Sequence, residues 1–96
     1  MTWEELVSSV TARHPVHEAK MFGMPCLKRE SGKVVAGHWK DGGVTVKLTD
    51  EAAREQALAL PGVELFDPGM GRVMKEWVLV PESHSDDWLR LVEQAI

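Results

Sequence analysis

Three apolar, β-prone runs separated by turn residues occupy the stretch from Lys20 to Leu48. The runs cover residues 20–27, 33–39 and 44–48, and the segments between them contain Ser31-Gly32 and Asp41-Gly42. Runs of this kind joined by short polar turns are typical of antiparallel strands. The stretch therefore predicts an antiparallel meander onto which the rest of the chain packs.

The first strand of this meander begins upstream, at Val16. Gly23 and Pro25 interrupt its pattern, and proline cannot donate a hydrogen bond to a neighbouring strand. We therefore expect one strand here that is bent, bulged or at an edge of the sheet around residues 21–27.

Helical patterns flank the meander. Thr2 and Glu5 fit a capping box at the start of a helix that Pro15 ends. A second helix is expected over 50–60, and a third, capped by Ser83 or Ser85, carries an apolar stripe at helical spacing. The stripe consists of Trp88, Leu91, Val92 and Ala95.

Two further strands are expected over 63–66 and 72–80, joined by a turn over 67–71 that contains Gly69 and Gly71. The element order is then α-β(3)-α-β(2)-α. Consecutive strands with short connections pair antiparallel, and helices separated from such a sheet cover one of its faces. The chain is therefore predicted to form one domain over 1–96, an α+β two-layer sandwich with an antiparallel five-stranded sheet.

Some of these strands are apolar on both faces. Val34 and Val35 are adjacent and point to opposite sides of a strand, as do the residues of the run 77–80. One interpretation is a central strand with a few apolar groups tolerated on the open face. The other is a homodimer in which a second copy covers that face. The second interpretation predicts an interaction surface of Val35, Trp39 and Val78.

The charge balance bears on nucleic-acid binding. The formal net charge of −4 disfavours unassisted binding to phosphates. Basic side chains nevertheless gather in and after the 28–33 region, so direct DNA binding through this hairpin remains an alternative. Its expected contacts are Lys28, Arg29, Lys33 and Lys40.

The single cysteine allows no internal disulfide and fits a reducing compartment. The N-terminal residues are acidic and no apolar run is long enough to span a bilayer. We therefore expect a cytoplasmic protein without a membrane partner.

Cys26 and His38 lie on neighbouring predicted strands, and a Cys–His pair in contact can form a nucleophile when an acid orients the imidazole. The sequence offers no such acid, so a structural cysteine is the favoured interpretation. A small enzyme or ligand carrier that uses Cys26 and His38 is kept as an alternative. His14 and His17 are separated by a helix-breaking proline, and no set of ligands for a metal follows. We expect no catalytic residues, no metal and no cofactor.

A series of short motifs resembles the N-terminal domain of the TfoX/Sxy proteins, which are bacterial regulators of natural competence. The motifs extend in order from Lys20 to the final helix, and the related MmcQ/YjbR group has a similar layout. They are Lys20-Met21-Phe22-Gly23, Gly32-Lys33-Val34-Val35-Ala36, Val46-Lys47-Leu48, Pro61-Gly62-Val63 with Phe66, Gly69-Met70-Gly71-Arg72 with Met74, and Trp77-Val78-Leu79-Val80-Pro81.

The resemblance implies the same element order, a secretion-chaperone-like sandwich and frequent dimerisation. It implies no catalytic residues. On this basis the expected function is a non-enzymatic module in transcription regulation. The module would act as a homodimer that binds a transcription factor or another protein.

Overall fold

The computed structural model describes residues 1–69 and 71–96. Within these residues, groups of consecutive strands are separated by helices. In chain order these are α1 (Trp3–Arg13), β1 (Val16–Met21), β2 (Met24–Arg29), β3 (Val34–His38), β4 (Val44–Lys47), α2 (Glu51–Leu58), β5 (Glu64–Phe66), β6 (Met74–Val80), the 3-10 helix η1 (Glu82–Asp87) and α3 (Trp88–Ala95).

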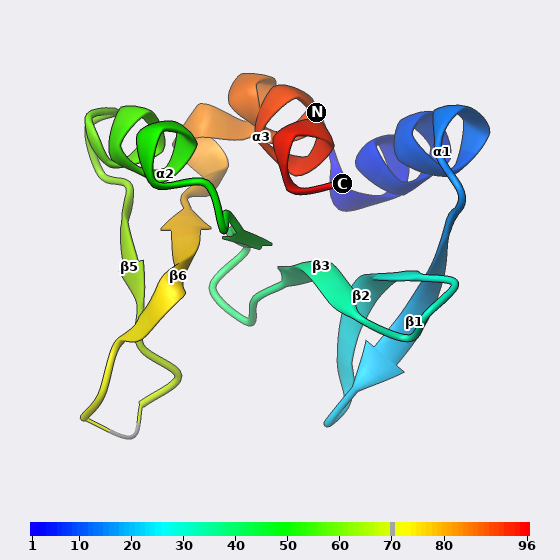
Figure 1. Ribbon diagram of the computed structural model, residues 1–96, viewed down its shortest axis with the longest axis horizontal. Coiled ribbons are helices and arrows are strands. Elements are labelled where there is room, and N and C mark those ends of the chain that lie inside the picture. The colour runs from blue at the N-terminus through cyan, green and yellow to red at the C-terminus, as the bar shows by residue number, and fades with distance from the viewer. Residues whose placement is uncertain (70) are drawn as a thin grey trace.

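The strands form one open sheet in the order β1-β2-β3-β4-β6-β5, and every neighbouring pair is antiparallel. The α-helices lie together on one face of this sheet, and the β1–β2 and β5–β6 pairs extend away from the helices at its two ends (Figure 1). The α+β class and the placing of the helices on one face agree with the sequence pattern.

The expected five-stranded sheet and the α-β(3)-α-β(2)-α order are wrong, because the described residues form six strands. The segment expected as one interrupted strand is a hairpin in which Met21 pairs with Met24. Phe22 and Gly23 form its turn with φ values of 52° and 81°. Positive φ at both central residues defines a type of two-residue turn whose backbone twist matches the twist of the paired strands. Pro25 lies within β2, which follows this turn directly.

The ends of the first two helices follow the sequence signals. Thr2 and Glu5 form the capping box, and the Asp50 carboxylate accepts a hydrogen bond from the Ala53 amide. The third helix differs from the expectation, because the short η1 precedes it and no serine side chain caps it. In the expected turn over 67–71, Gly69 and Gly71 have positive φ, whereas Met70 lies outside the described residues.

The main core lies between the helices and the sheet. The expected stripe of α3 packs there, with Trp88, Leu91 and Val92 almost fully buried. Val35 and Val78 belong to the same core, with exposed fractions of 3% and 0%. Both were expected on an exposed interaction surface, and the helix layer covers them instead.

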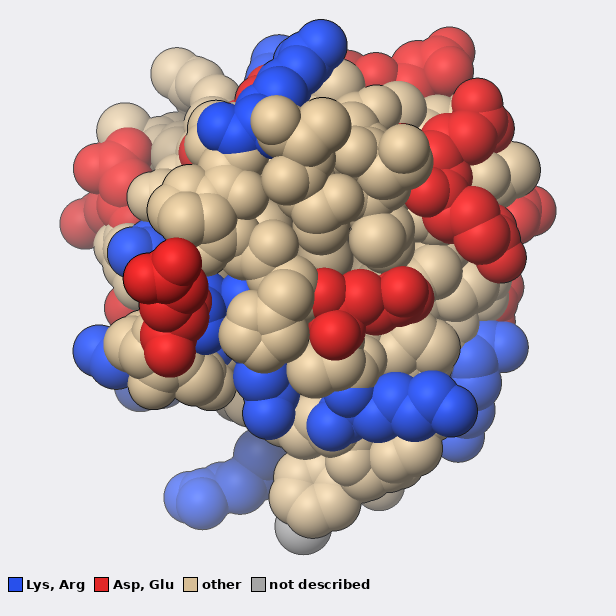
Figure 2. Space-filling view, turned by 90° about the vertical axis from the view of Figure 1, so that its right-hand side faces the viewer, with Lys and Arg blue, Asp and Glu red and all other residues tan. Residues whose placement is uncertain are grey.

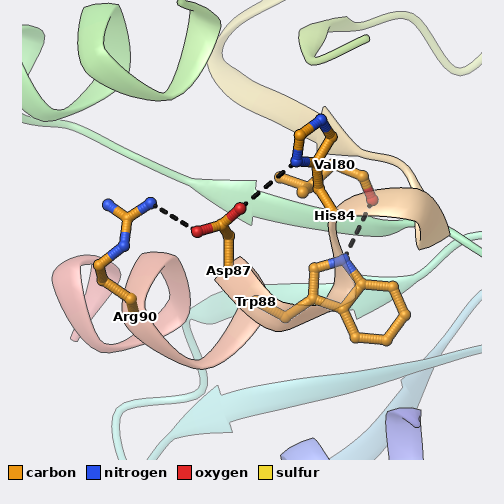
Figure 3. A network of polar contacts seen from close by, with 5 residues as sticks. All are labelled: Val80, His84, Asp87, Trp88 and Arg90. Atoms are coloured by element: carbon orange, nitrogen blue, oxygen red, sulfur yellow. Dashed lines mark hydrogen bonds and ion pairs between the residues drawn. The ribbon is translucent and has the colours of Figure 1, made fainter. Parts of the chain in front are cut away.

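A polar network fixes the start of α3 against the sheet (Figure 3). The Trp88 indole N–H donates to the Val80 carbonyl at the end of β6, at 3.2 Å. The Asp87 carboxylate lies 3.0 Å from Arg90 and 3.4 Å from His84. These contacts hold the pKa of Asp87 below its ordinary value, first through the hydrogen bond from Arg90 and then through that from His84.

The opposite face of the sheet has its own, smaller apolar cluster. Its central row contains Cys26, Gly37 and Thr45, which pair in register and are buried. The Met24 side chain lies over Gly37 so closely that a methyl group at position 37 would come 2.5 Å from Cε of Met24. Trp39 and Phe66 meet on this face as well, with ring centroids 4.7 Å apart.

Candidate functional site

A depression of about 260 Å³ lies between the β1–β2 turn and the end of β3. We call it the Trp39 depression. Its walls are mostly apolar, and His38 and Lys40 are also among the residues that line it. The residues used below are Phe22, Met24, Pro25, His38, Trp39 and Lys40.

Phe22 forms an exposed wall of the Trp39 depression. Its relative exposure is 102%, so the phenyl ring has no cover from the rest of the described chain. It also has a φ of 52°, a conformation that bulky residues rarely adopt and that asparagine or glycine would occupy at lower cost. A fully exposed apolar side chain on a strained backbone contributes little to the stability of the fold. The combination favours a role in binding.

Trp39 also lines the depression and is half-buried. Its ring is fixed from two sides, because Phe66 meets it at 81° and the Lys40 ammonium lies 5.2 Å from its centroid. A pre-ordered aromatic side chain loses little conformational entropy when a ligand binds, and tryptophan is enriched among residues that dominate binding energy. The predicted surface position of Trp39 therefore falls in a site with suitable geometry.

Charge is distributed unevenly between the two layers of the molecule. Eight of the 11 Lys and Arg residues lie in the strands and the turns that join them. Nine of the 15 Asp and Glu residues lie in the helices or cap them. On the side shown in Figure 2, most blue side chains gather in the lower half, where the sheet lies. The sheet side, which holds the Trp39 depression, thus favours an acidic ligand.

The sheet itself separates Cys26 from His38. Cys26 pairs with Gly37 on the face opposite the helices. The next residue, His38, points to the helix face, where its ring stacks on Trp3 of α1 at 5.2 Å. Burial raises the pKa of the Cys26 thiol, Glu18 raises it further, and Lys28 opposes them. The pair does not form the contact that a nucleophile and its base require.

The four basic residues expected to contact DNA do not form one patch. Arg29 donates to the Ala95 and Ile96 carbonyls at 2.8 and 3.1 Å, so its guanidinium holds the end of α3. Lys33 and Lys40 lie at opposite ends of β3, and seven extended residues span roughly 23 Å. Lys28 is half-exposed on β2.

A second depression, of about 190 Å³, brings a different set of cations together. Arg29, Lys33 and Lys47 line it, with Thr49 nearby. Lys47 was not among the expected basic contacts. Its position follows from the antiparallel pairing of β3 with β4, which brings the end of β4 beside the start of β3.

The remaining histidines have ordinary surroundings. His14 lies 2.8 Å from Glu93 and so connects the end of α1 to α3. His17 is exposed on β1. Among the residues that the structure describes, no group of three or more His, Cys, Asp or Glu side chains is arranged to hold a metal ion.

None of the helices in the described part of the chain has the combined length and apolar character needed to cross a bilayer. Comparison of the chain with family models, with curated proteins and with solved structures gives no match. The fold defines an α+β protein with one antiparallel sheet, and the resemblance to TfoX/Sxy proteins stays a prediction.

The sequence interpretation missed the exposed position of Phe22 in the β1–β2 turn. Its signal was present, because Phe-Gly stands between two methionines in a β-prone run. A large apolar residue in the first position of a two-residue turn contradicts turn preferences, and such a conflict points to function.

Proposed function

We propose that the protein is a non-enzymatic interaction module that binds another protein through the Trp39 depression. The observation that carries this proposal is the pair of aromatic walls, with Phe22 fully exposed and Trp39 held in place by Phe66. The expectation of a homodimer in transcription regulation, as in TfoX/Sxy proteins, is retained as part of the proposal.

The chemistry of the depression specifies the partner. Two aromatic rings with Met24 and Pro25 accommodate one large apolar side chain. The Lys40 ammonium beside the Trp39 ring favours a carboxylate next to that side chain. The partner is therefore a protein segment in which an aromatic or branched apolar residue is flanked by Asp or Glu.

Selection from a random peptide display library tests this function. Wild-type protein serves as bait, and each recovered peptide is then titrated against the wild type and against the Phe22→Ser variant. Recovered peptides should share an apolar residue next to acidic ones. Their affinity should fall about tenfold or more in Phe22→Ser, since burying a phenyl ring at an interface contributes roughly 1.5–3 kcal/mol.

A matched control is Val73→Ser, because Val73 is also exposed, at 50%, and is not one of the residues that line the Trp39 depression. This variant should bind the selected peptides as the wild type does. A selection that yields only basic sequences, or peptides that bind Phe22→Ser equally well, would refute the proposed site.

The basic depression supports direct DNA binding as a second candidate function. Lys33 and Lys47 supply the cations for contacts with phosphates, while Arg29 beside them holds the end of α3. Fluorescence anisotropy of a labelled duplex decides between the two functions. Binding that falls steeply with salt and is lost in Lys33→Glu, while Phe22→Ser binds normally, would favour DNA over a protein partner.

A further inference from the structure

The sheet has two edges, and they differ in how well they are protected. The β5 edge has three residues and an irregular register between Leu65 and Phe66. The β1 edge has six residues that pair with β2 without a break, from Val16 to Met21. Short or irregular edge strands resist pairing with another chain, whereas a long regular edge is a template for it. β1 is therefore the edge on which a further strand fits.

The β1–β2 turn determines which backbone groups point outward. A two-residue turn closes on a hydrogen-bonded pair, here Met21 and Met24. Alternation along the ladder then directs the N–H and C=O groups of Met21, Ala19 and His17 toward β2. Those of Glu18 and Lys20 point away from the sheet and are available to another strand.

The side chains of this edge complement a second copy of themselves. If β1 pairs antiparallel with the same strand of another subunit about a two-fold axis at Ala19, Glu18 lies opposite Lys20 of the partner subunit. The symmetry repeats this ion pair on the other side of the axis. Opposite charges directly across an antiparallel pair stabilise it, and both residues also supply the outward backbone groups.

We propose that the protein forms a two-fold dimer by antiparallel pairing of β1 with β1 of a second copy, centred on Ala19. This joins the two sheets into one continuous sheet and makes the edge, rather than either face, the dimer interface. It rests on the proposed function in one respect, because that function includes a homodimer, and it places the dimer interface at β1 and not at the Trp39 depression.

Two other arrangements make different predictions. Charged residues on an edge strand can prevent pairing, in which case Glu18 and Lys20 would keep the protein monomeric. Pairing centred on Glu18 would place that residue opposite Glu18 of the partner subunit, and like charges directly opposite are destabilising. Lys20 would then face no carboxylate, and changing it would have little effect.

Sedimentation equilibrium of charge variants separates these arrangements. Wild type should show twice the chain mass of 10.7 kDa. Glu18→Lys and Lys20→Glu alone should each weaken the dimer about tenfold or more, because two attractive pairs become repulsive. An equal mixture of the two variants should regain dimers, since each charge again meets its opposite. Lys33→Glu is the control, with the same charge change on an exposed residue away from β1, and should leave the dimer intact.

Glu18 also accepts a hydrogen bond from the Trp3 indole at 3.1 Å, so circular dichroism must show that Glu18→Lys is folded. If Glu18→Lys unfolds, the dimer is tested with Lys20→Glu alone. A monomeric wild type, a Lys20→Glu variant that stays dimeric, or folded variants that remain monomeric when mixed would each overturn the proposal. Binding of the selected peptides to Lys20→Glu should equal that of the wild type, so loss of the dimer is distinguishable from failure of the proposed function.

Discussion

The indole ring of Trp39 meets the phenyl ring of Phe66 edge-on, with 4.7 Å between the ring centroids and 81° between the ring planes. Trp39 follows β3 and Phe66 ends β5, and two strands, β4 and β6, lie between them in the sheet. The two rings thus reach across the face opposite the helices, where Phe66 is only 6% exposed. This contact joins the two rings in the smaller apolar cluster and orients the Trp39 side chain that lines the Trp39 depression.

Replacing Trp39 with alanine should therefore weaken both the fold and binding. Removing a buried aromatic side chain costs about 3–5 kcal/mol, and because Trp39 is half-buried we expect about 2 kcal/mol. Trp39→Phe keeps an aromatic ring near Phe66 and should recover most of this loss. Urea unfolding of the three proteins measures the effect, and an unchanged midpoint in Trp39→Ala would show that the ring contact does not support the sheet.

Phe22→Asn should make the protein more stable. The turn needs positive φ at this position, where asparagine is tolerated far better than phenylalanine. The lost phenyl ring is fully exposed, so no packing is removed. We expect a gain of about 1 kcal/mol, the lower end of the cost of such strain.

Thermal unfolding measures this gain, and the peptide-binding assay measures its consequence. A more stable variant that no longer binds would show that the strain serves binding. Lower stability would mean that the Phe22 ring packs on the protein in solution, contrary to its exposure.

The sequence predicted much of the helix layer, because its signals are local. The capping box at Thr2 and Glu5 and the apolar stripe of α3 depend on residues a turn apart, and both occur as expected. The strand count was wrong because Phe22-Gly23 lacks the usual asparagine or aspartate of such a turn. Pro25 was interpreted as an interruption, although it occupies the second position of β2, near one end of the strand.

The candidate site was only partly predictable. Trp39 was expected at a surface, and it lies in the wall of a depression. Val35 and Val78 were expected beside it, yet the alternation of a strand does not reveal which of two apolar faces the helices cover. The contact with Phe66 joins residues 27 positions apart in the sequence, and no local pattern encodes it.

Cys26 should react slowly with alkylating reagents. It is fully buried, and its burial raises the pKa of the thiol above the ordinary value of 9.0. Both effects lower the amount of accessible thiolate near neutral pH. Iodoacetamide should label the folded protein about tenfold or more slowly than the urea-unfolded chain. Rapid labelling of the folded protein near neutral pH would instead support the alternative in which Cys26 acts as a nucleophile.

The ion pairs of Asp87 should make part of the stability depend on pH. The hydrogen bond from Arg90, then that from His84, lowers the pKa of Asp87 in the folded protein below its ordinary value of 3.8. A carboxylate of this kind stabilises the fold fully above its unfolded pKa and loses that contribution as the pH falls through the folded pKa. Asp87→Asn should accordingly be less stable than wild type at neutral pH, and the difference should shrink as the pH falls below 3.8.

Urea unfolding at a series of pH values measures this difference, with Asp86→Asn as the control. Asp86 is the exposed neighbour of Asp87 and lies outside the network that joins η1 to α3. Glu5 also has a lowered pKa, through its hydrogen bonds with Thr2, but it titrates equally in all three proteins and cancels in the comparison. A stability difference between Asp87→Asn and wild type that stays constant into strong acid would show that the side chain acts through its shape rather than its charge.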